Sequence, residues 1–348
     1  MSVSAAENAV AHLYHSWITG QVLTLVSRAG ADAAEAFVFR LFRTQHHEKF
    51  LGGLTKLGLD HLPHAVAAAR YHYFSNQLGG VQVEYLEVDE RKAWIRYPPP
   101  RWIWQGSAIC GIPSNVNRAM LHGWHAHNGV TLNNPRLGFV CTKTTVDGQP
   151  GLEGYYQEFD HVLAEDERLQ FRPEEDCPWI DPASLPELDS NRWPEERRAK
   201  AYRNYAMEYL RNGLPILVSL FGPEQALYLG RLCGLQIGMH CYREIARLMQ
   251  VSDDSPESFA QLLAALLIGS GDTVTRIGVD LEQNQWRIFQ EGSIHPVVRQ
   301  IWLSVYEGLL QAHNRFLKLN LDGQRITIAS TTTSTTTSTT TSTTFNSR

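Results

Sequence analysis

The segment Val83-Glu-Tyr-Leu-Glu-Val-Asp89 decides the fold, because a second segment, Val274-Thr-Arg-Ile-Gly-Val-Asp280, repeats its pattern. In both segments apolar residues alternate with polar ones. A tryptophan beside an arginine and an isoleucine follows each segment, at Trp94 and at Trp286. Alternation around a polar turn is typical of a β-hairpin. We therefore expect two similar hairpins, one in each half of the chain.

Further elements follow both hairpins in the same order. Each half continues with a helix-like stretch, at Asn115–Asn128 and at Val297–His313, and then with a short strand. Both strands end in the tripeptide Asp-Gly-Gln, at residues 147–149 and 322–324, and Asp-Gly is a strong hairpin-turn signal. Four elements in one order indicate an internal duplication. We predict an α+β fold of two pseudo-repeated lobes, each a short antiparallel sheet packed with helices.

Changes in composition place the boundaries of these parts. Residues 1–49 have helical periodicity and are predicted to form an N-terminal helical segment, before a first α+β lobe at 50–172. Prolines and acidic residues make 173–194 a linker, and 195–329 are predicted to form the second lobe. Serine and threonine alone fill residues 330–344. Because such residues cannot form an apolar core, we predict a disordered tail at 330–348.

The overall composition argues against several classes of function. The 348 residues include 36 acidic and 31 basic side chains, so the net charge of −5 does not predict binding to nucleic acid or to anionic membranes. No apolar run approaches the roughly 20 residues that cross a bilayer, and no secretory signal is visible, so we expect a cytoplasmic protein. Five cysteines do not predict a disulfide framework. The expected partner is a small-molecule substrate or ligand, and a homodimer formed through the second lobe stays open.

A cluster of histidines, at His122, His125 and His127, is the densest group of chemically active side chains. Imidazoles provide acid–base catalysis near neutral pH and also bind metals. On a helix, His122 and His125 share a face, whereas His127 points elsewhere unless the helix ends at Asn128. Three interpretations stay open: surface or structural residues, catalytic residues of a pocket, and metal ligands.

The strand at residues 151–159 offers a second group. Side chains alternate along a strand, so Glu153 and Tyr155 share one face, and Tyr156 and Glu158 share the other. A carboxylate beside a phenol provides a proton acceptor and a proton donor for a polar substrate. We predict His122, His125, Glu153 and Tyr155 as catalytic residues. The alternative is a strand face that only contacts solvent.

Other aromatic and polar residues are predicted to contact the substrate. The proline-rich insertion at 98–112 contains two tryptophans and is stiff enough to cover a pocket. Cys141 lies in a strand-like run and is expected to be buried. His240 lies four residues before Glu244, a spacing that orients an imidazole on a helix. The predicted substrate-binding residues are Trp102, Trp104, Trp124, Cys141, Tyr156 and His240.

Glycine-spaced segments resemble the 4-vinyl-reductase domain. They are Leu220–Glu224, Gly230–Gly238, the hairpin at Gly271–Asp280 and the helix containing Tyr306–Leu310. The stretch Leu137–Gly148, with the strand that follows it, resembles the terminal hairpin of that superfamily. It also resembles the related 2-amino-thiazoline-4-carboxylate hydrolases.

The resemblance implies an α/β pocket for small molecules, used in some proteins as a ligand sensor attached to a transcription activator and in others within an enzyme. The sensor type places zinc-binding cysteines around its terminal glycine turn. Here Thr144–Val146 and Gly151–Glu153 occupy those positions, so that zinc site is not expected.

Together these patterns predict a small-molecule enzyme with hydrolase-like acid–base chemistry in an aromatic-lined pocket of the first lobe. One alternative is a small-molecule binding or sensor protein without catalysis. A second is a metal-dependent enzyme that uses His122, His125 and His127. No organic cofactor is expected, and a bound metal stays open.

Overall fold

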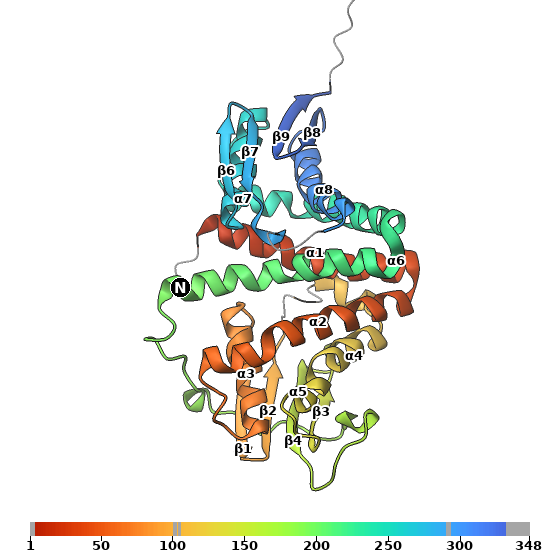
Figure 1. Cartoon of the computed structure of the whole chain (residues 1–348), viewed down its shortest axis with the longest axis vertical. Coiled ribbons are helices and arrows are strands. Elements are labelled where there is room, and N and C mark those ends of the chain that lie inside the picture. Colours follow the sequence, from red (N-terminus) through yellow and green to blue (C-terminus); the bar gives the residue numbers. More distant parts are fainter. Residues whose placement is uncertain (1–3, 100–102, 104–105, 290–293, 332–348) are drawn as a thin grey trace, which may run out of the picture.

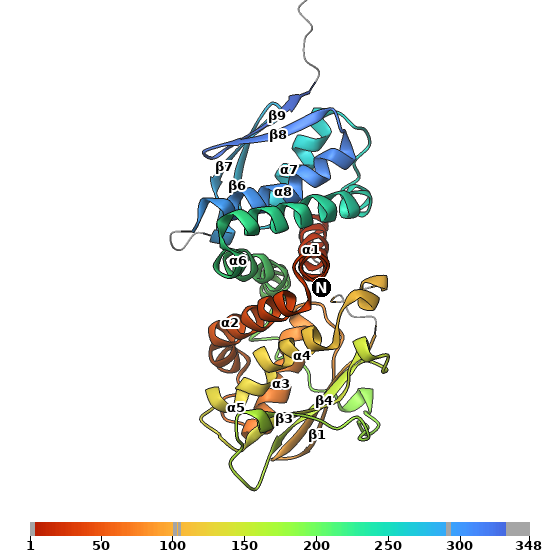
Figure 2. The same cartoon turned by 90° about the vertical axis from the view of Figure 1, so that its right-hand side faces the viewer.

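Two lobes lie at opposite ends of a layer of long helices (Figure 1, Figure 2). The computed structural model describes residues 4–99, 103, 106–289 and 294–331. Each lobe is a sheet packed with helices, so the α+β fold class with two sheet-containing lobes is confirmed. None of the described helices is both long and apolar enough to span a bilayer.

The first lobe contains a five-stranded sheet in the order β1-β2-β4-β3-β5. Neighbouring strands are antiparallel, except that the short β5 runs parallel to β3. One face of the sheet packs against helices, and the side chains on this face form part of the apolar core. The elements are α3 (His64–Leu78), β1 (Glu84–Asp89), β2 (Lys92–Tyr97), α4 (Ser114–Gly123), α5 (Asn128–Thr131), β3 (Leu137–Lys143), β4 (Leu152–Glu158) and β5 (Leu169–Phe171).

The second lobe repeats the order helix, hairpin, helix, hairpin. Its four strands lie in the order β6-β7-β9-β8, which matches β1-β2-β4-β3 of the first lobe. Both Asp-Gly-Gln tripeptides lie in the turn that joins the last two strands of this common unit. The elements are α7 (Pro256–Gly269), β6 (Thr273–Ile277), β7 (Asp280–Gln285), α8 (Pro296–His313), β8 (Leu317–Asp322) and β9 (Arg325–Ser330).

The two hairpins are equivalent, but the two segments that predicted them are not aligned residue for residue. Asp89 ends β1 and pairs with Lys92, whereas in the second hairpin Ile277 pairs with Asp280. Asp280 therefore begins the second strand of its hairpin. The structural equivalent of Asp89 is Ile277, three residues before the Asp280 that matches it in sequence. The turn of the second hairpin contains Gly278, which has a φ of 65°. The alternation of apolar residues, not the final aspartate, is what the hairpins share.

Two pairs of long helices form the central layer. The first lobe is preceded by α1 (Ala5–Ala29) and α2 (Ala31–Leu57), and the second lobe by α6 (Glu195–Leu248). A glycine breaks the helical path in both cases: Gly30 has φ 95° and ψ 165°, and Gly222 inside α6 has φ 74° and ψ 165°. The predicted boundary at residue 49/50 falls inside α2, because this helix continues without a break to Leu57.

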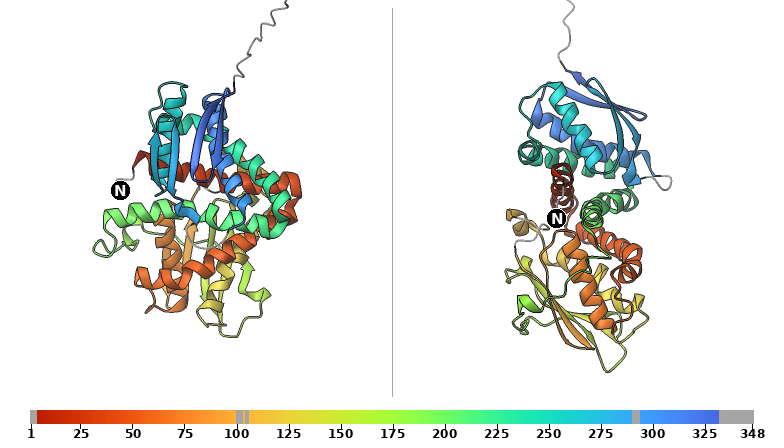
Figure 3. Two further views of the ribbon diagram at one scale, coloured as in Figure 1. Left: turned by 45° about the horizontal axis from the view of Figure 1, so that its top comes forward. Right: turned by 90° about the vertical axis from the view of Figure 1, so that its left-hand side faces the viewer.

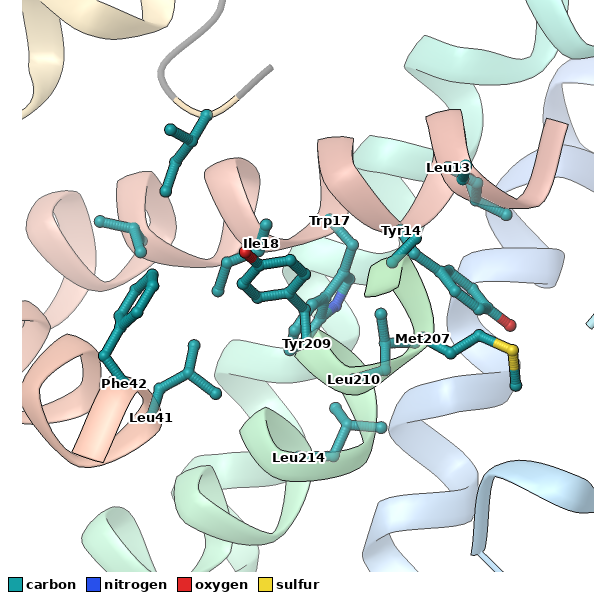
Figure 4. Packing of buried hydrophobic residues seen from close by; sticks show 14 of the residues in the cluster. Leu13, Tyr14, Trp17, Ile18, Leu41, Phe42, Met207, Tyr209, Leu210 and Leu214 are labelled. Carbon is teal, nitrogen blue, oxygen red and sulfur yellow. The ribbon is translucent and has the colours of Figure 1, made fainter. Parts of the chain in front are cut away.

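The first helix of each pair packs against the opposite lobe. From α1, Tyr14 hydrogen-bonds to Tyr306 of α8, with 2.8 Å between the hydroxyl oxygens. From the first half of α6, Tyr205 donates a hydrogen bond of 2.9 Å to Asn76 of α3. Between the lobes α1 and α6 meet through buried side chains such as Trp17 and Leu210 (Figure 3, Figure 4). The core is therefore continuous from one lobe to the other.

The predicted linker follows the outer face of the first sheet. Lys143 of β3 donates hydrogen bonds to the carbonyl oxygens of Pro173 and Glu175, at 2.6 and 2.8 Å. The backbone N–H of Cys177 donates to Glu153 of β4. The start of this segment is thus part of the first lobe. The predicted tail lies outside the described residues from position 332 onward.

Candidate functional site

The first lobe contains a cavity of about 330 Å³ between α2, α3 and the first half of α6. Aromatic rings form much of its wall, and polar and charged side chains also line it. Since α6 contributes residues from far along the chain, the cavity forms only when the helical layer is assembled. Its lining includes Phe42, Lys49, Gly52, Gly53, Tyr71, His72, Asn76, Tyr97, Trp124, His125, Tyr205, Glu208 and Tyr209.

A network of buried polar side chains borders the cavity through His72 and His125. Tyr156 of β4 is fully buried, and its hydroxyl lies 2.8 Å from Nδ1 of His125 and 2.8 Å from the amide nitrogen of Asn128. The same amide nitrogen lies 3.3 Å from Nε2 of His72. The rings of His72 and His125 stack with their centroids 4.1 Å apart. Two elements, α3 and the turn after α4, thus place two imidazoles face to face.

One arrangement of protons agrees with these three contacts. In this orientation Asn128 donates one amide hydrogen to Tyr156 and the other to His72 Nε2. Tyr156 can then donate to Nδ1 of His125, which leaves the His125 proton on Nε2 and the His72 proton on Nδ1. Burial raises the pKa of Tyr156 well above its ordinary value, so the phenol stays protonated. The arrangement is therefore suited to neutral imidazoles.

Charged residues join α2 to α6 at the cavity. Nζ of Lys49 lies 2.9 Å from a carboxylate oxygen of Glu208, and Arg211 contacts the same carboxylate at 3.2 Å. Asn76 also links two elements, because it accepts from Tyr205 of α6 and donates to the backbone of His72. The first half of α6 is thus attached to the lobe that it covers by polar contacts as well as by apolar packing.

The equivalent position of the second lobe has no such network. In the first sheet, Tyr156 lies between Ala93 and Phe139 in a row across β2, β4 and β3. Ala93 directly follows Lys92, the residue paired across the first hairpin turn, and Leu281 follows Asp280 in the same way. The equivalent row across β7, β9 and β8 is therefore Leu281, Ile326 and Leu321, and all three are apolar. In this row, therefore, only the first lobe has a buried phenol; the buried polar groups of the second lobe, such as Asp272 and Gln283, lie elsewhere.

No family model, curated protein or solved structure matches this chain. The likeness to the 4-vinyl-reductase domain therefore stays a prediction. The structure gives the glycines that carry this likeness a packing role. Gly230, Gly234 and Gly238 of α6 all face α8, where an added Cβ atom would overlap with Ile301, Ser304 and the backbone of Val305.

The predicted catalytic residues lie on both sides of the first sheet, with His125 at the cavity and Glu153 and Tyr155 on the opposite face. Glu153 and Tyr155 share a face, as strand alternation predicts, but it is the face opposite to Tyr156 and the cavity. Glu153 accepts hydrogen bonds from Thr142 and from the backbone of Cys177, at 2.8 and 2.9 Å. Tyr155 packs against Trp94, and burial raises its pKa to about 12. Both residues hold the outer face of the sheet to the linker.

The three histidines of the cluster do not converge. The predicted helix ends as α4 at Gly123, where an added Cβ would lie 2.8 Å from the carbonyl oxygen of Phe39. His125 turns inward to the first cavity. His122 is exposed and, with His127, lines a second cavity of about 580 Å³, which the N-terminal half of α2 also lines. The close approach of α4 to α2 causes this division.

The remaining predicted residues have different positions. Trp124 and Tyr156 lie at the first cavity and in its polar network. Cys141 is buried, and burial raises the pKa of its thiol to about 12, so it stays protonated. His240 is exposed on α6, and Glu244 binds Arg247 at 2.6 Å. Trp102 and Trp104 lie outside the described residues.

Sequence reasoning missed His72, Asn76 and Asn128. One signal was available, because His72 and Asn76 are four residues apart in an alanine-rich helix and so share a face. Nothing local indicates that Tyr205 and Glu208 meet this face, since they come from the helix that precedes the other lobe.

Two adjacent glycines of α2 allow a direct test of the cavity wall. A Cβ on Gly52 would have no atom within 4 Å, so Gly52→Ala is expected to stabilise the protein by about 1 kcal/mol through helix propensity. A Cβ on Gly53 would overlap with the ring of Tyr71, which Phe50 and Trp124 hold in place. Gly53→Ala is expected to destabilise by about 1–3 kcal/mol. Urea unfolding measures both, and equal effects would contradict this account.

Proposed function

We propose that the first-lobe cavity binds a small, mostly aromatic molecule that carries one polar group. The observation that supports this most directly is the stacked pair of His72 and His125 in a cavity that is lined by several aromatic rings and by polar side chains. Small-molecule sites are typically apolar, with a few fixed polar groups that orient the ligand. Neutral imidazoles suit a neutral hydroxyl or carbonyl group of the ligand.

The course of α6 favours a binding or sensing role. This helix covers the cavity with Tyr205 and Tyr209 and then continues past Gly222 into the second lobe. There its second half packs closely against α8 through Gly234 and Gly238. A ligand that changes the position of the first half of α6 therefore acts on an element shared by both lobes. Such a ligand would shift the population of arrangements of the two lobes.

Acid–base catalysis is the second candidate, and the contact between Tyr156 and Nδ1 of His125 favours it. A protonated phenol paired with an imidazole can exchange a proton with a bound substrate through the ring. Hydrolase-like chemistry would also require water at the reacting atom. We rank it second because the described hydrogen bonds of Tyr156 hold the network together within the protein.

The binding proposal is tested with 2-naphthol, which has a bicyclic aromatic body and one hydroxyl group. We expect saturable binding by fluorescence titration, weaker binding of naphthalene, and a loss of about fivefold in 2-naphthol affinity for His72→Leu, because one hydrogen bond contributes about 1 kcal/mol. The control is His61→Leu, an exposed residue outside the cavity lining. Absence of binding, or an equal loss in the control, would reject the proposal.

The same probe separates binding from catalysis. Incubation with 2-naphthyl acetate releases fluorescent 2-naphthol if the protein hydrolyses the ester. We expect no release above the rate in buffer. Release that is lost in His125→Phe and kept in His61→Leu would instead support the acid–base enzyme.

A further inference from the structure

A second group of histidines lies outside the first cavity. His46 and His47 are adjacent on α2, and His127 ends the turn η2 (His125–His127) before α5. One ring nitrogen from each lies within 4.8 Å of the others, and this is the one such group of three metal-ligating side chains among the described residues. The ring of His127 lies 5.2 Å from that of His46 and 5.0 Å from that of His47, between centroids.

His46 is the member that calls for an explanation. Its side chain is completely buried, and within the described part of the chain neither ring nitrogen has a hydrogen-bond partner. Buried polar groups in proteins are almost always paired. Aromatic neighbours fix the ring, because it stacks on Phe50 at 4.9 Å and meets Trp124 edge-on at 5.6 Å. A buried imidazole without a partner, beside two other imidazoles, has the lone pair that a metal ion requires.

The charge state of the group agrees with this geometry. Burial and neighbouring positive groups lower the pKa of His46 to about 2 and that of His127 to about 4, so both rings are neutral near pH 7. Only a neutral imidazole binds a metal. The nearby cation of Arg43 is directed to the carbonyl oxygens of Gly123 and His122, at 2.9 and 2.8 Å.

We propose that His46, His47 and His127 bind one divalent transition-metal ion of the zinc class. Three imidazole nitrogens are a ligand set that suits zinc, nickel and copper, and three protein ligands leave a fourth position for water or another small ligand. His127 also lines the second cavity, together with Glu35 and Glu165, so the ion would lie at the wall of that cavity. The proposal does not require a ligand in the first cavity, although Trp124 contacts His46 and also lines that cavity.

The experiment uses the full chain after treatment with a chelator, and the probe is Zn²⁺ alone. Isothermal titration calorimetry is expected to show one Zn²⁺ bound per chain. Loss of a residue that hydrogen-bonds to a metal ligand typically weakens metal binding by about 10–100-fold, and loss of the ligand itself should weaken it at least as much. We therefore expect His47→Asn and His127→Asn each to lose at least about tenfold in zinc affinity. Cobalt provides a second readout, because its visible absorption reports coordination by the protein.

The control is His61→Asn, which removes an exposed histidine that is not part of the group and should leave zinc affinity unchanged. His47 is exposed, so its replacement is not expected to disturb folding, which circular dichroism checks. The proposal is overturned if the wild-type chain shows no saturable binding. It is also overturned if folded His47→Asn binds zinc as tightly as the wild type, or if His61→Asn loses as much affinity.

Discussion

Replacing Gly238 with alanine is expected to lower the free energy of unfolding by about 3 kcal/mol or more. An alanine Cβ at this position would overlap with the carbonyl oxygen of Val305 and would lie 2.7 Å from the backbone nitrogen of Leu309. Both atoms belong to the backbone of α8, which cannot move aside as a flexible side chain can. The helices would have to separate along their whole contact.

The contact between α6 and α8 extends well beyond one residue. Gly230, Gly234 and Gly238 are spaced by four residues and lie along one side of the second half of α6. From the facing helix, a Cβ on Gly308 would overlap with the backbone of Leu235. Without side chains at these positions the two backbones approach directly. Any residue larger than glycine at position 238 removes apolar contacts on both sides.

Urea unfolding followed by circular dichroism measures this loss, and Gly52→Ala is the matched control. It makes the same chemical change inside a helix, at a position where the new methyl group has no atom within 4 Å. The control should gain stability while Gly238→Ala loses it. Similar changes in both variants would show that helix propensity, not the contact with α8, determines the effect.

Local patterns were sufficient to predict that each lobe is a sheet packed with helices. Alternating residues predicted both hairpins, and the two Asp-Gly-Gln turns marked the last strand pair in each half. The same patterns could not align the hairpins, because Asp89 and Asp280 match in letters while the turn of the second hairpin lies before its aspartate. Alternation reports which residues share a face and does not report where a turn lies.

The site was harder to predict, because it depends on contacts between distant segments. Strand alternation correctly separated Tyr155 from Tyr156 but did not indicate which of them faces the helices. The histidines after residue 121 were grouped by sequence spacing, yet the approach of α4 to α2 sends His125 to one cavity and His127 to His46. The wall provided by Tyr205 requires the first half of α6 to cross to the first lobe, and no local signal encodes that.

A final prediction concerns the contact between the two crossing helices. His15 of α1 is 9% exposed and lies edge-on to the rings of Tyr205 and Tyr209 of α6, at 6.0 and 6.1 Å. Burial, with a smaller effect of His12, lowers the pKa of His15 from 6.5 to about 3. The folded protein therefore keeps this ring neutral at pH values where an unfolded chain protonates it.

The sign of the pH effect follows from this difference. Below pH 6.5 the unfolded state binds a proton at His15 that the folded state does not bind. The free energy of unfolding is therefore unaffected by His15 above pH 6.5 and decreases as the pH falls toward 3. At about 1.4 kcal/mol per pH unit, His15 should account for a loss of about 2.7 kcal/mol between pH 7.5 and 4.5. His15→Gln cannot take up this proton, so its stability should fall less over the same range.

Urea unfolding of the wild type and of His15→Gln at pH 7.5, 6.0 and 4.5 measures the difference. Asp272, whose pKa burial raises to about 6, changes the stability in the opposite direction, but it does so equally in both proteins and therefore cancels. His61→Gln is the control, because His61 is exposed and its replacement should leave the pH dependence unchanged. Parallel curves for the wild type and His15→Gln would show that His15 is protonated in the folded protein. In that case the contact between α1 and α6 would have to accommodate a charge.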